Sequence, residues 1–295
     1  MKLVSFRTHD GYEGYGIHDG NGVIDIKQRV APNLVDLKHF IAECGTEAAN
    51  LFLGEQIDFH EEEIRYLPVI NKPEKIICVG MNYQDKRIEF GATNPAPTLF
   101  IRFADSQTAH NEEVIKPFHT EQLDYEGELA IIVGKTCSHV SPDQVPGVVA
   151  GYSCYMDGSV RDWQHTWFTA GKNWKKTGSF GPWLVTKDEV PNPQNLSIKT
   201  WLNGVMVQNA STQSMIHSIN ELVSYISTFT ELSAGDVILT GSPGGVGKSR
   251  VPPLFMQVGD TIEVEIEKIG RLKNHIASDK KNNTTNPEFS YSIIN

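Results

Sequence analysis

Two acidic residues stand two positions apart in segment 124–134, which reads Asp-Tyr-Glu-Gly-Glu-Leu-Ala-Ile-Ile-Val-Gly. If this segment is a β-strand, Glu126 and Glu128 project from the same face, because residues i and i+2 share a face. The apolar run after Glu128 predicts that the second half of the strand is buried on both sides. Adjacent carboxylates entering a core repel each other unless a cation neutralises them. The pair is therefore either a strand end that emerges into water or a divalent-metal site, in which oxygen ligands favour Mg²⁺, Mn²⁺ or Ca²⁺ over Zn²⁺.

A third acid, Asp157, follows the strand-like run 151–156. If Ser159 caps a helical turn, Arg161 and Gln164 lie on one face of that turn, near Asp157. Arg161 would then be a bidentate clamp for a carboxylate, and Gln164 a polar positioning group. The alternative is a structural Asp–Arg pair at a strand-to-helix turn.

A lysine, Lys172, stands among glycine and aromatic residues in Ala-Gly-Lys-Asn-Trp. As a point charge it could stabilise a developing enolate. The alternative is a solvated loop lysine.

The segment 239–249, Leu-Thr-Gly-Ser-Pro-Gly-Gly-Val-Gly-Lys-Ser, is similar to a phosphate-binding loop but fails the pattern. That motif requires glycine at position 242, which is Ser242, and these glycines do not precede a predicted helix. A tight turn that lines a substrate fits better. The sequence contains no HExxH, GxSxG or dinucleotide-binding fingerprint, so zinc protease, α/β-hydrolase and NAD-enzyme interpretations lack support.

The composition limits the class of protein. With 26 Lys and Arg against 36 Asp and Glu, the net charge is −10. This balance argues against nucleic acid or an anionic membrane as a partner, but it allows a small anionic substrate held by a few local cations. The polar N-terminal residues predict no signal peptide, and the apolar runs are too short to cross a bilayer. Because no two cysteines form a CxxC pair, we expect reduced thiols and a cytoplasmic protein.

Residues 1–72 are expected to form a small N-terminal domain. Runs 2–7 and 12–18 predict strands, and Asp-Gly-Asn-Gly at 19–22 predicts a hairpin turn before 23–26. An amphipathic helix is expected after Asn33, ending near Gly45, with an apolar face of Leu34, Leu37, Phe40 and Ile41. Pro68 and Pro73 bracket a connector, where we place the boundary.

Residues 73–278 are expected to form the second domain, followed by a polar C-terminal tail at 279–295. The predicted strands are 75–79, 129–133, 148–155, 183–186, 197–202, 237–240 and 261–266. One helix is predicted after Ser218, which forms a capping-box pattern with Glu221. Many short strands with few helices predict an α+β, β-rich fold with a mixed roll or sandwich core, rather than a doubly wound sheet.

In combination, these segments resemble the fumarylacetoacetate hydrolase superfamily, in particular its short acylpyruvase-like and oxaloacetate decarboxylase-like members. The resemblance extends from Lys75 to about Ala277. Its motifs, in chain order, are Lys-Ile-Ile-Cys-Val-Gly-Met-Asn-Tyr at 75–83, the 124–134 segment, Ala-Gly-Tyr at 150–152, Asp157, Arg-Asp-Trp-Gln at 161–164, Gly-Lys at 171–172, Gly-Pro-Trp-Leu-Val-Thr at 181–186, 236–247 and Gly-Asp at 259–260. Each motif is weak alone, but this many in the same order make coincidence very improbable.

The resemblance implies a homodimer with a mixed β-roll core and a site for Mg²⁺ or Mn²⁺, with Ca²⁺ as an alternative. The metal ligands would be Glu126, Glu128 and Asp157. The substrate would be a small anionic 2-oxo acid, whose oxo and carboxylate oxygens chelate the metal so that an enolate leaving group is stabilised. The residues expected to bind it are Arg161, Gln164, Lys172, Ser242 and Arg102. Ser242 stands where the family usually has threonine, and it keeps the hydroxyl group.

Two positions depart from the family pattern. Hydrolases of the family place a histidine three residues before a glutamate on a mobile lid, and this pair orients the attacking water. Here Glu89 is kept, but the histidine is Lys86, which as an ammonium cannot accept a proton from water. Lys86 would act as a base only if it were strongly desolvated, and Glu89 would oppose that shift. The other departure, Asn-Trp-Lys-Lys at 173–176 where many relatives have Ser-Phe-Asp-Thr, adds two positive charges that bind a more anionic substrate or face solvent.

Three functions follow from these residues. The first is a metal-dependent hydrolase of an acylpyruvate C–C bond, with Lys172, Glu89 and Lys86 as catalytic candidates and His110 or His119 as possible substitutes for the lid histidine. The second is a decarboxylase or isomerase of an oxaloacetate-like or muconate-like acid, which needs the metal as an electron sink but no water-activating base. The third is a metal-binding relative without activity. The retained acids, arginine and lysine argue against an inactive relative. Hydrolysis is the commoner activity in the family, which slightly favours the hydrolase.

Overall fold

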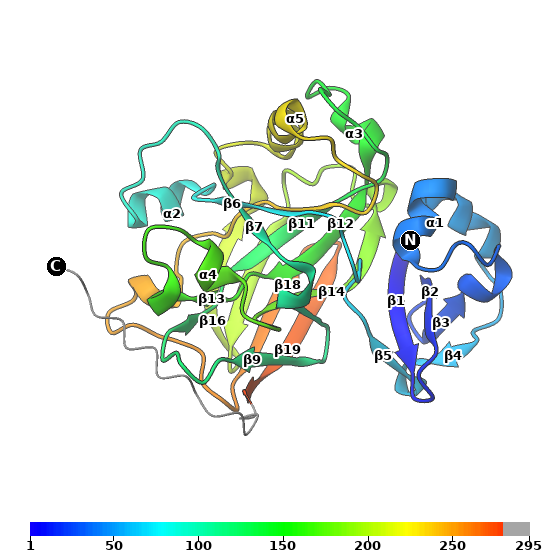
Figure 1. The fold of residues 1–295 in the computed structure, drawn as a ribbon, viewed down its shortest axis with the longest axis horizontal. Coiled ribbons are helices and arrows are strands. Elements are labelled where there is room, and N and C mark those ends of the chain that lie inside the picture. Colours follow the sequence, from blue (N-terminus) through cyan, green and yellow to red (C-terminus); the bar gives the residue numbers. More distant parts are fainter. Residues whose placement is uncertain (280–295) are drawn as a thin grey trace.

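The computed structural model describes residues 1–279, so the expected tail lies outside the described residues except for Asp279. Within this range the main sheet has 12 strands, in the order β4-β3-β2-β1-β14-β12-β11-β17-β6-β7, with β5 paired to β1 and β8 to β14 (Figure 1). The strands of this sheet are β1 (Lys2–Thr8), β2 (Glu13–His18), β3 (Gly22–Asp25), β4 (Phe59–His60), β5 (Ile64–Tyr66), β6 (Ile76–Gly80), β7 (Thr98–Arg102), β8 (Gln107–Ala109), β11 (Gly127–Val133), β12 (Val149–Met156), β14 (Gly178–Thr186) and β17 (Val237–Leu239).

A second sheet of five strands covers one face of the main sheet, in the order β16-β15-β18-β19-β9. Its strands are β9 (Glu113–Lys116), β15 (Ser197–Leu202), β16 (Val205–Ser211), β18 (Thr261–Ile266) and β19 (Gly270–Ser278). The largest apolar core lies between the two sheets and takes Leu129, Ile131 and Val133 from β11. Alternate residues of the same strand, Ala130 and Ile132, enter a second core. β11 is thus buried on both faces, as its apolar run predicted.

Few helices accompany these sheets. They are α1 (Leu37–Cys44), α2 (Gln84–Glu89), α3 (Val145–Val148), α4 (Thr169–Lys172) and α5 (Ile219–Phe229). Ser218 and Glu221 form the predicted capping box at the start of α5. In the described part of the chain, no helix is long and apolar enough to span a membrane. The predicted α+β, β-rich fold is confirmed.

The N-terminal strands stand beside the main body but share its sheet (Figure 1). The pairing of β1 with β14 joins Lys2 to Val185 and Leu3 to Leu184. The helix in this part begins at Leu37, three residues later than expected, because the Asp36 side chain caps it by accepting the His39 N–H. The division into domains at residues 72 and 73 stays a prediction.

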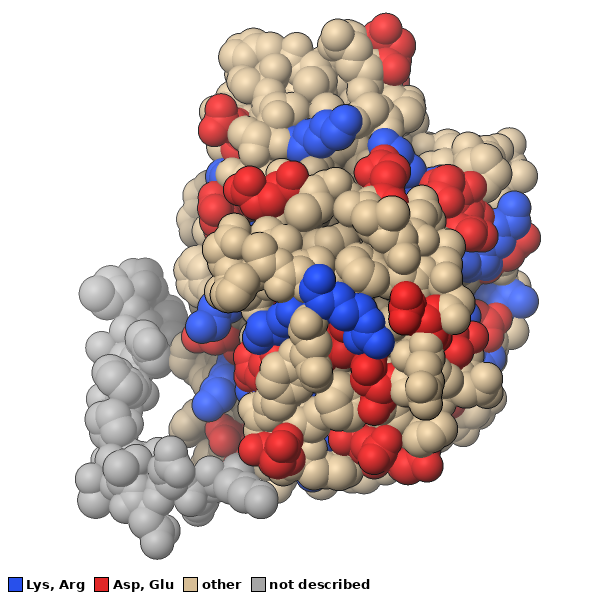
Figure 2. Space-filling view, turned by 90° about the vertical axis from the view of Figure 1, so that its right-hand side faces the viewer, with Lys and Arg blue, Asp and Glu red and all other residues tan. Residues whose placement is uncertain are grey.

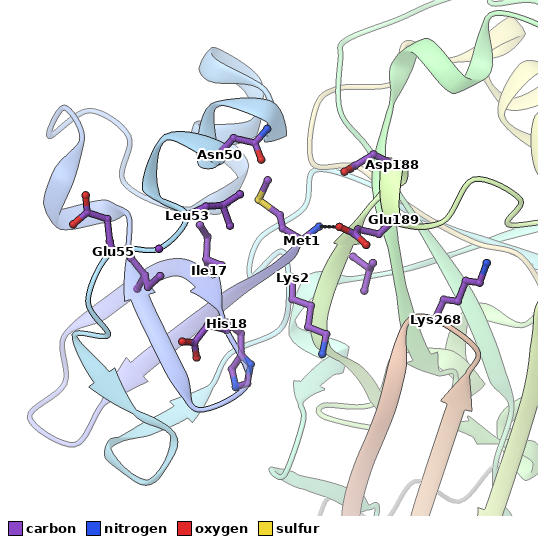
Figure 3. Close-up of a pocket in the computed structure, with 14 residues that line it drawn as sticks. Met1, Lys2, Ile17, His18, Asn50, Leu53, Glu55, Asp188, Glu189 and Lys268 are labelled. Carbon is purple, nitrogen blue, oxygen red and sulfur yellow. Dashed lines mark ion pairs between the residues drawn. The ribbon is translucent and has the colours of Figure 1, made fainter.

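A cleft of about 690 Å³ lies between the N-terminal strands and the main body. The Met1 ammonium approaches Glu189 across it, at 3.3 Å, as Figure 3 shows. Charges of both signs line this cleft. On the face of the molecule in Figure 2, basic and acidic side chains are likewise interspersed among uncharged ones.

Candidate active site

The three predicted metal ligands lie together where β11 and β12 meet. Glu126 and Glu128 flank the first residue of β11, and Asp157 follows the last residue of β12. The antiparallel register pairs Gly127 with Met156, and the Asp157 N–H donates to the Glu126 carbonyl at 2.8 Å. Strand pairing therefore gathers the carboxylates, and one oxygen of each lies within 4.8 Å of the others. All three side chains are buried, so the alternative of a strand end in water is wrong.

Glu128 is the acid that most needs a cation. Burial raises its pKa well above the usual range, and the neighbouring Asp157 and Glu126 raise it further. Its Oε2 accepts the Gly241 N–H at 2.9 Å, but no ion pair links it to a lysine or arginine among the described residues. Three buried carboxylates, one of them without an ion-pair partner in the described structure, form a donor set that fits Mg²⁺, Mn²⁺ or Ca²⁺.

Lys172 lies between two of the acids. It is the last residue of α4, it is 2% exposed, and its ammonium donates to the carboxylates of both Glu126 and Asp157. Gly171 allows this approach, since a Cβ there would stand 2.7 Å from the Val160 carbonyl oxygen. Burial alone would lower the pKa of Lys172, but Asp157 and Glu126 outweigh it and raise that pKa. The solvated-loop alternative for Lys172 is wrong.

Arg161 opens a 3₁₀ turn after the short strand β13 (Ser159–Val160). Its Nη2 lies 3.1 Å from Glu126 Oε1, and its Nη1 donates to Gln164 Oε1 at 3.1 Å, so Arg161 and Gln164 share a face as predicted. Ser159 does not cap this turn, because it pairs in β13 and its hydroxyl donates to Glu126 Oε2 at 2.9 Å. The Gln164 amide nitrogen is buried and has no hydrogen-bond partner in the described structure.

Asp124 is a buried residue that the sequence reasoning missed. It lies in β10 (Leu123–Asp124), and its Oδ2 accepts from Arg161 Nε at 2.8 Å and from the Lys248 N–H at 3.0 Å. Its Oδ1 accepts the N–H groups of Gly247, at 2.7 Å, and Tyr125, at 2.8 Å. The glycine-rich loop therefore wraps a carboxylate of its own chain rather than a phosphate. The sequence signal that could have identified Asp124 is its position two residues before Glu126, which puts both on one face of a strand.

Arg102, at the end of β7, lies behind the triad and pairs with Asp157 at 2.6 Å. Arg102, and not Arg161, is thus the arginine partner of Asp157. Both side chains are fully buried. That Arg102 contacts a substrate remains a prediction.

The short helix α2 contacts the triad through Lys86. Lys86 is 3% exposed, and its ammonium donates to Glu126 Oε1 at 2.7 Å and to Ser242 Oγ at 3.4 Å. Burial lowers the pKa of Lys86 although Glu126 opposes that shift. Glu89 points elsewhere, since its carboxylate accepts the Gly245 N–H at 3.3 Å. Glu126 is the acid that most opposes the shift. Glu89 also interacts with Lys86, because burial raises the pKa of Glu89 and the Lys86 ammonium opposes that rise.

The remaining candidates lie apart from the three acids. His110 accepts the Lys273 N–H at 3.1 Å and packs on the Tyr66 ring, with 4.9 Å between ring centroids. His119 is exposed beside Phe118. Neither histidine forms a hydrogen bond or ion pair with the triad in the described structure. Of the two extra lysines at 175 and 176, the first is exposed and the second half-buried.

Comparison with known proteins identifies the class to which this fold and site belong. Residues 75–277 match the family model described as fumarylacetoacetate (FAA) hydrolase C-terminal. The chain therefore belongs to the fumarylacetoacetate hydrolase family of enzymes.

Particular relatives extend over nearly the whole chain. A human mitochondrial oxaloacetate tautomerase is 35% identical over 289 residues, which cover 94% of this chain and 91% of that protein. A 2,4-didehydro-3-deoxy-L-rhamnonate hydrolase from Sphingomonas is 35% identical over 282 residues, which cover 94% of this chain and 96% of that protein. These names include a tautomerase and a hydrolase, so the family alone leaves the reaction open.

Solved structures agree with the fold. A fumarylacetoacetate hydrolase from psychrophilic Exiguobacterium antarcticum has a TM-score of 0.83 and 33% identity, covering 95% of this chain and 100% of that one. A maleylpyruvate hydrolase from Sphingobium, in complex with manganese(II) and pyruvate, has a TM-score of 0.79 and 26% identity over the same shares.

Proposed function

We propose that this chain is a divalent-metal-dependent enzyme that interconverts the enol and keto forms of a small dianionic, oxaloacetate-like 2-oxo acid. In this isomerisation a proton leaves the oxygen on C2 and another is added at C3, so that no water is consumed. The observation that carries the proposal is the position of Lys86. It lies against Glu126 at the triad, at the place where hydrolases of the family would hold a water-orienting histidine.

The lid residues support a reaction without water. A lysine ammonium donates hydrogen bonds but has no lone pair with which to accept a proton from water. Glu89 does not compensate, because its carboxylate is turned towards the Gly245 N–H. The Lys86 ammonium is instead suited to donate a proton to C3 of an enolate, because it lies at the triad and burial lowers its pKa. The resulting amine takes up its next proton from the solvent.

The charges around the triad support a dianionic substrate. Four buried acids, Asp124, Glu126, Glu128 and Asp157, are matched by four buried cations, Lys86, Arg102, Arg161 and Lys172. A bound divalent cation would add two positive charges to this balanced cluster. A substrate with two negative charges would neutralise them, whereas a monoanion would leave one positive charge uncompensated.

Glu126, Glu128 and Asp157 would hold the metal, Mg²⁺ or Mn²⁺ with Ca²⁺ as an alternative. When bound, it would supply a Lewis acid that stabilises enolate charge on the substrate. The unpartnered amide nitrogen of Gln164 and the N–H groups that Arg161 has left over would orient a substrate carboxylate. Ser242 and Lys172 complete the proposed binding residues.

A product assay tests this proposal. Oxaloacetate and acetylpyruvate are offered in parallel with Mg²⁺ or Mn²⁺, with EDTA as the control. We expect metal-dependent enol–keto conversion of oxaloacetate, seen as the change in enol absorbance, and little acetate from acetylpyruvate. Release of acetate and pyruvate as the faster reaction would instead support the second candidate, acylpyruvate hydrolysis, which the hydrolase names among the relatives favour.

We further propose a cytoplasmic homodimer. The support for the dimer is the resemblance to the family. The support for the compartment is that all four cysteines are free thiols in the structure. Analytical ultracentrifugation of the purified chain tests the dimer, and a monomeric mass would contradict it.

A further inference from the structure

We propose that Arg102 is a positioning residue that fixes Asp157 for metal binding, and that it is not a substrate ligand. The inference rests on the metal-binding part of the proposed function and is independent of the reaction catalysed.

All five N–H groups of the Arg102 guanidinium are already engaged by the protein. Nη1 donates to Asp157 Oδ1 at 2.6 Å and to the Gly158 carbonyl at 3.0 Å. Nη2 donates to the Ser106 carbonyl at 3.2 Å and to Thr177 Oγ1 at 3.1 Å, and Nε donates to Ser106 Oγ at 3.2 Å. A guanidinium has five donors, so none remains for a substrate oxygen.

The contact determines how Asp157 presents its two oxygens. Oδ1 is held by Arg102, while Oδ2 pairs with Lys172, whose ammonium also pairs with Glu126. Rotation of the carboxylate would break its ion pair with Arg102, in which both side chains are fully buried. Loss of one partner from such a pair is strongly unfavourable. Arg102 therefore selects the Asp157 oxygen that is available to a cation.

The surrounding backbone is shaped to hold a guanidinium. A Cβ at Gly178, the first residue of β14, would stand 2.7 Å from Arg102 Nη2 and 2.9 Å from its Cζ. The acceptors of Arg102 come from three separate segments, at Ser106, at 157–158 and at Thr177. A lysine at this position would present three donors from one atom and could not span them. Ser106 and Thr177 are themselves fixed, because their hydroxyls donate to the carbonyls of Phe103 and Trp174.

The test is a calorimetric titration of Mn²⁺ and Mg²⁺ into the wild type and two variants. Outer partners of metal ligands typically change metal affinity by about 10- to 100-fold when replaced. We therefore expect Arg102→Lys to raise the metal Kd about 10- to 100-fold. We expect Thr177→Val, which removes one acceptor without changing the shape, to raise it about threefold or more. With saturating metal, the substrate KM of both variants should stay within about twofold of the wild type.

The matched control is Arg271→Lys, because Arg271 is an arginine that also pairs with carboxylates, those of Glu263 and Glu265, but it is 47% exposed and distant from the triad. Its metal Kd should not change. An unchanged metal Kd in Arg102→Lys, with a raised KM, would show that Arg102 binds substrate and would overturn the inference. If Arg102→Lys fails to fold, the Thr177→Val variant serves as the test. An unchanged metal Kd in Thr177→Val would also overturn the inference. If the wild type binds neither metal, the proposed metal-dependent function fails. If the wild type binds metal and the variants bind it equally well, only the inference about Arg102 fails.

Discussion

Glu128 is the acid with the least compensation, and its removal should separate metal binding from folding. Glu128→Ala removes a buried carboxylate whose pKa is raised by burial and by the two acids beside it. We expect loss of detectable Mg²⁺ and Mn²⁺ binding and of turnover, because one of three ligands is gone. The thermal midpoint of the metal-free protein should not fall, since an unfavourable acid is lost. Calorimetry, thermal unfolding and the product assay check this, and undiminished turnover would contradict the assignment of the site.

Lys86 is the residue that separates proton transfer from hydrolysis. Lys86→Met keeps the length of the side chain but cannot carry a proton, so we expect enol–keto turnover to fall by about 100-fold or more. Lys86→Arg is the matched control, because it keeps the positive charge but does not release a proton near neutral pH. It should be nearly as impaired as Lys86→Met.

The reverse exchange at this position tests the second candidate function. Lys86→His restores the lid histidine that hydrolases of the family carry. If the chain is a weakened hydrolase, cleavage of acetylpyruvate should rise in this variant. The proposal advanced above predicts no such gain, together with lower enol–keto turnover. A clear rise in released acetate would count against it.

At the scale of elements, one carboxylate connects the glycine-rich loop to the site. Asp124→Asn would keep one oxygen for the Gly247 N–H, but its amide group would meet two other donors, the Lys248 N–H and Arg161 Nε. We expect Arg161 and the loop to lose their alignment, which raises substrate KM about tenfold. The metal Kd should change less than twofold, because Asp124 contacts no metal ligand itself and Glu126 keeps its ion pairs with Lys86 and Lys172 when Arg161 shifts. A large change in metal Kd with an unchanged KM would refute this division of roles.

The elements show what the sequence could and could not predict. Strand alternation and apolar runs predicted β11 and β12, and their ends placed the three acids correctly. The partner of each acid was not predictable, because pairing across the site depends on contacts distant in sequence. Arg102 and Asp157 form an ion pair although they are 55 positions apart in the sequence, and Lys86 and Glu126 are 40 positions apart. A cap at Ser159 is a possibility that the sequence offers, because serine favours that position, but Ser159 instead pairs with Asp124 in a strand.

At the scale of the whole molecule, His110 makes stability depend on pH. Its pKa is lowered from 6.5 to about 4, mainly by burial; Glu61 opposes this shift, and Lys273 and His18 add to it. Its Nδ1 accepts the Lys273 N–H, so protonation breaks that hydrogen bond. The unfolded chain binds this proton near pH 6.5 and the folded protein only near pH 4. Stability should therefore fall as pH is lowered between these values, by up to about 3 kcal/mol.

His110→Asn tests this dependence, because the asparagine oxygen can still accept the Lys273 N–H but does not titrate. We expect the difference in the free energy of unfolding between pH 7.5 and pH 5, measured by urea denaturation, to be smaller in this variant. The exposed His119, replaced by asparagine, provides the matched control. An equal pH dependence in wild type and His110→Asn would contradict the assignment.

The arrangement of the whole molecule was the part least visible in the sequence. The expected hairpin and strands of residues 1–26 are present, but their attachment to the main sheet is not encoded locally. It depends on the pairing of Leu3 with Leu184, which are far apart in the chain. Composition and motifs were sufficient for the family and for the fold class, because those rest on many short segments in a fixed order. They did not determine the reaction, because the proposal for it rests on the position of Lys86, which only the structure shows.

The central claim is that this site transfers protons at C3 of a 2-oxo acid and does not activate water. Its most direct test is proton NMR of oxaloacetate in D₂O with Mg²⁺, comparing the wild type, Lys86→Met and a metal-free control containing EDTA. We predict that the wild type accelerates exchange of the C3 protons for deuterium in a metal-dependent manner, and that Lys86→Met does not. Exchange at the uncatalysed rate, with acetate released from acetylpyruvate under the same conditions, would contradict the claim and make the protein a hydrolase.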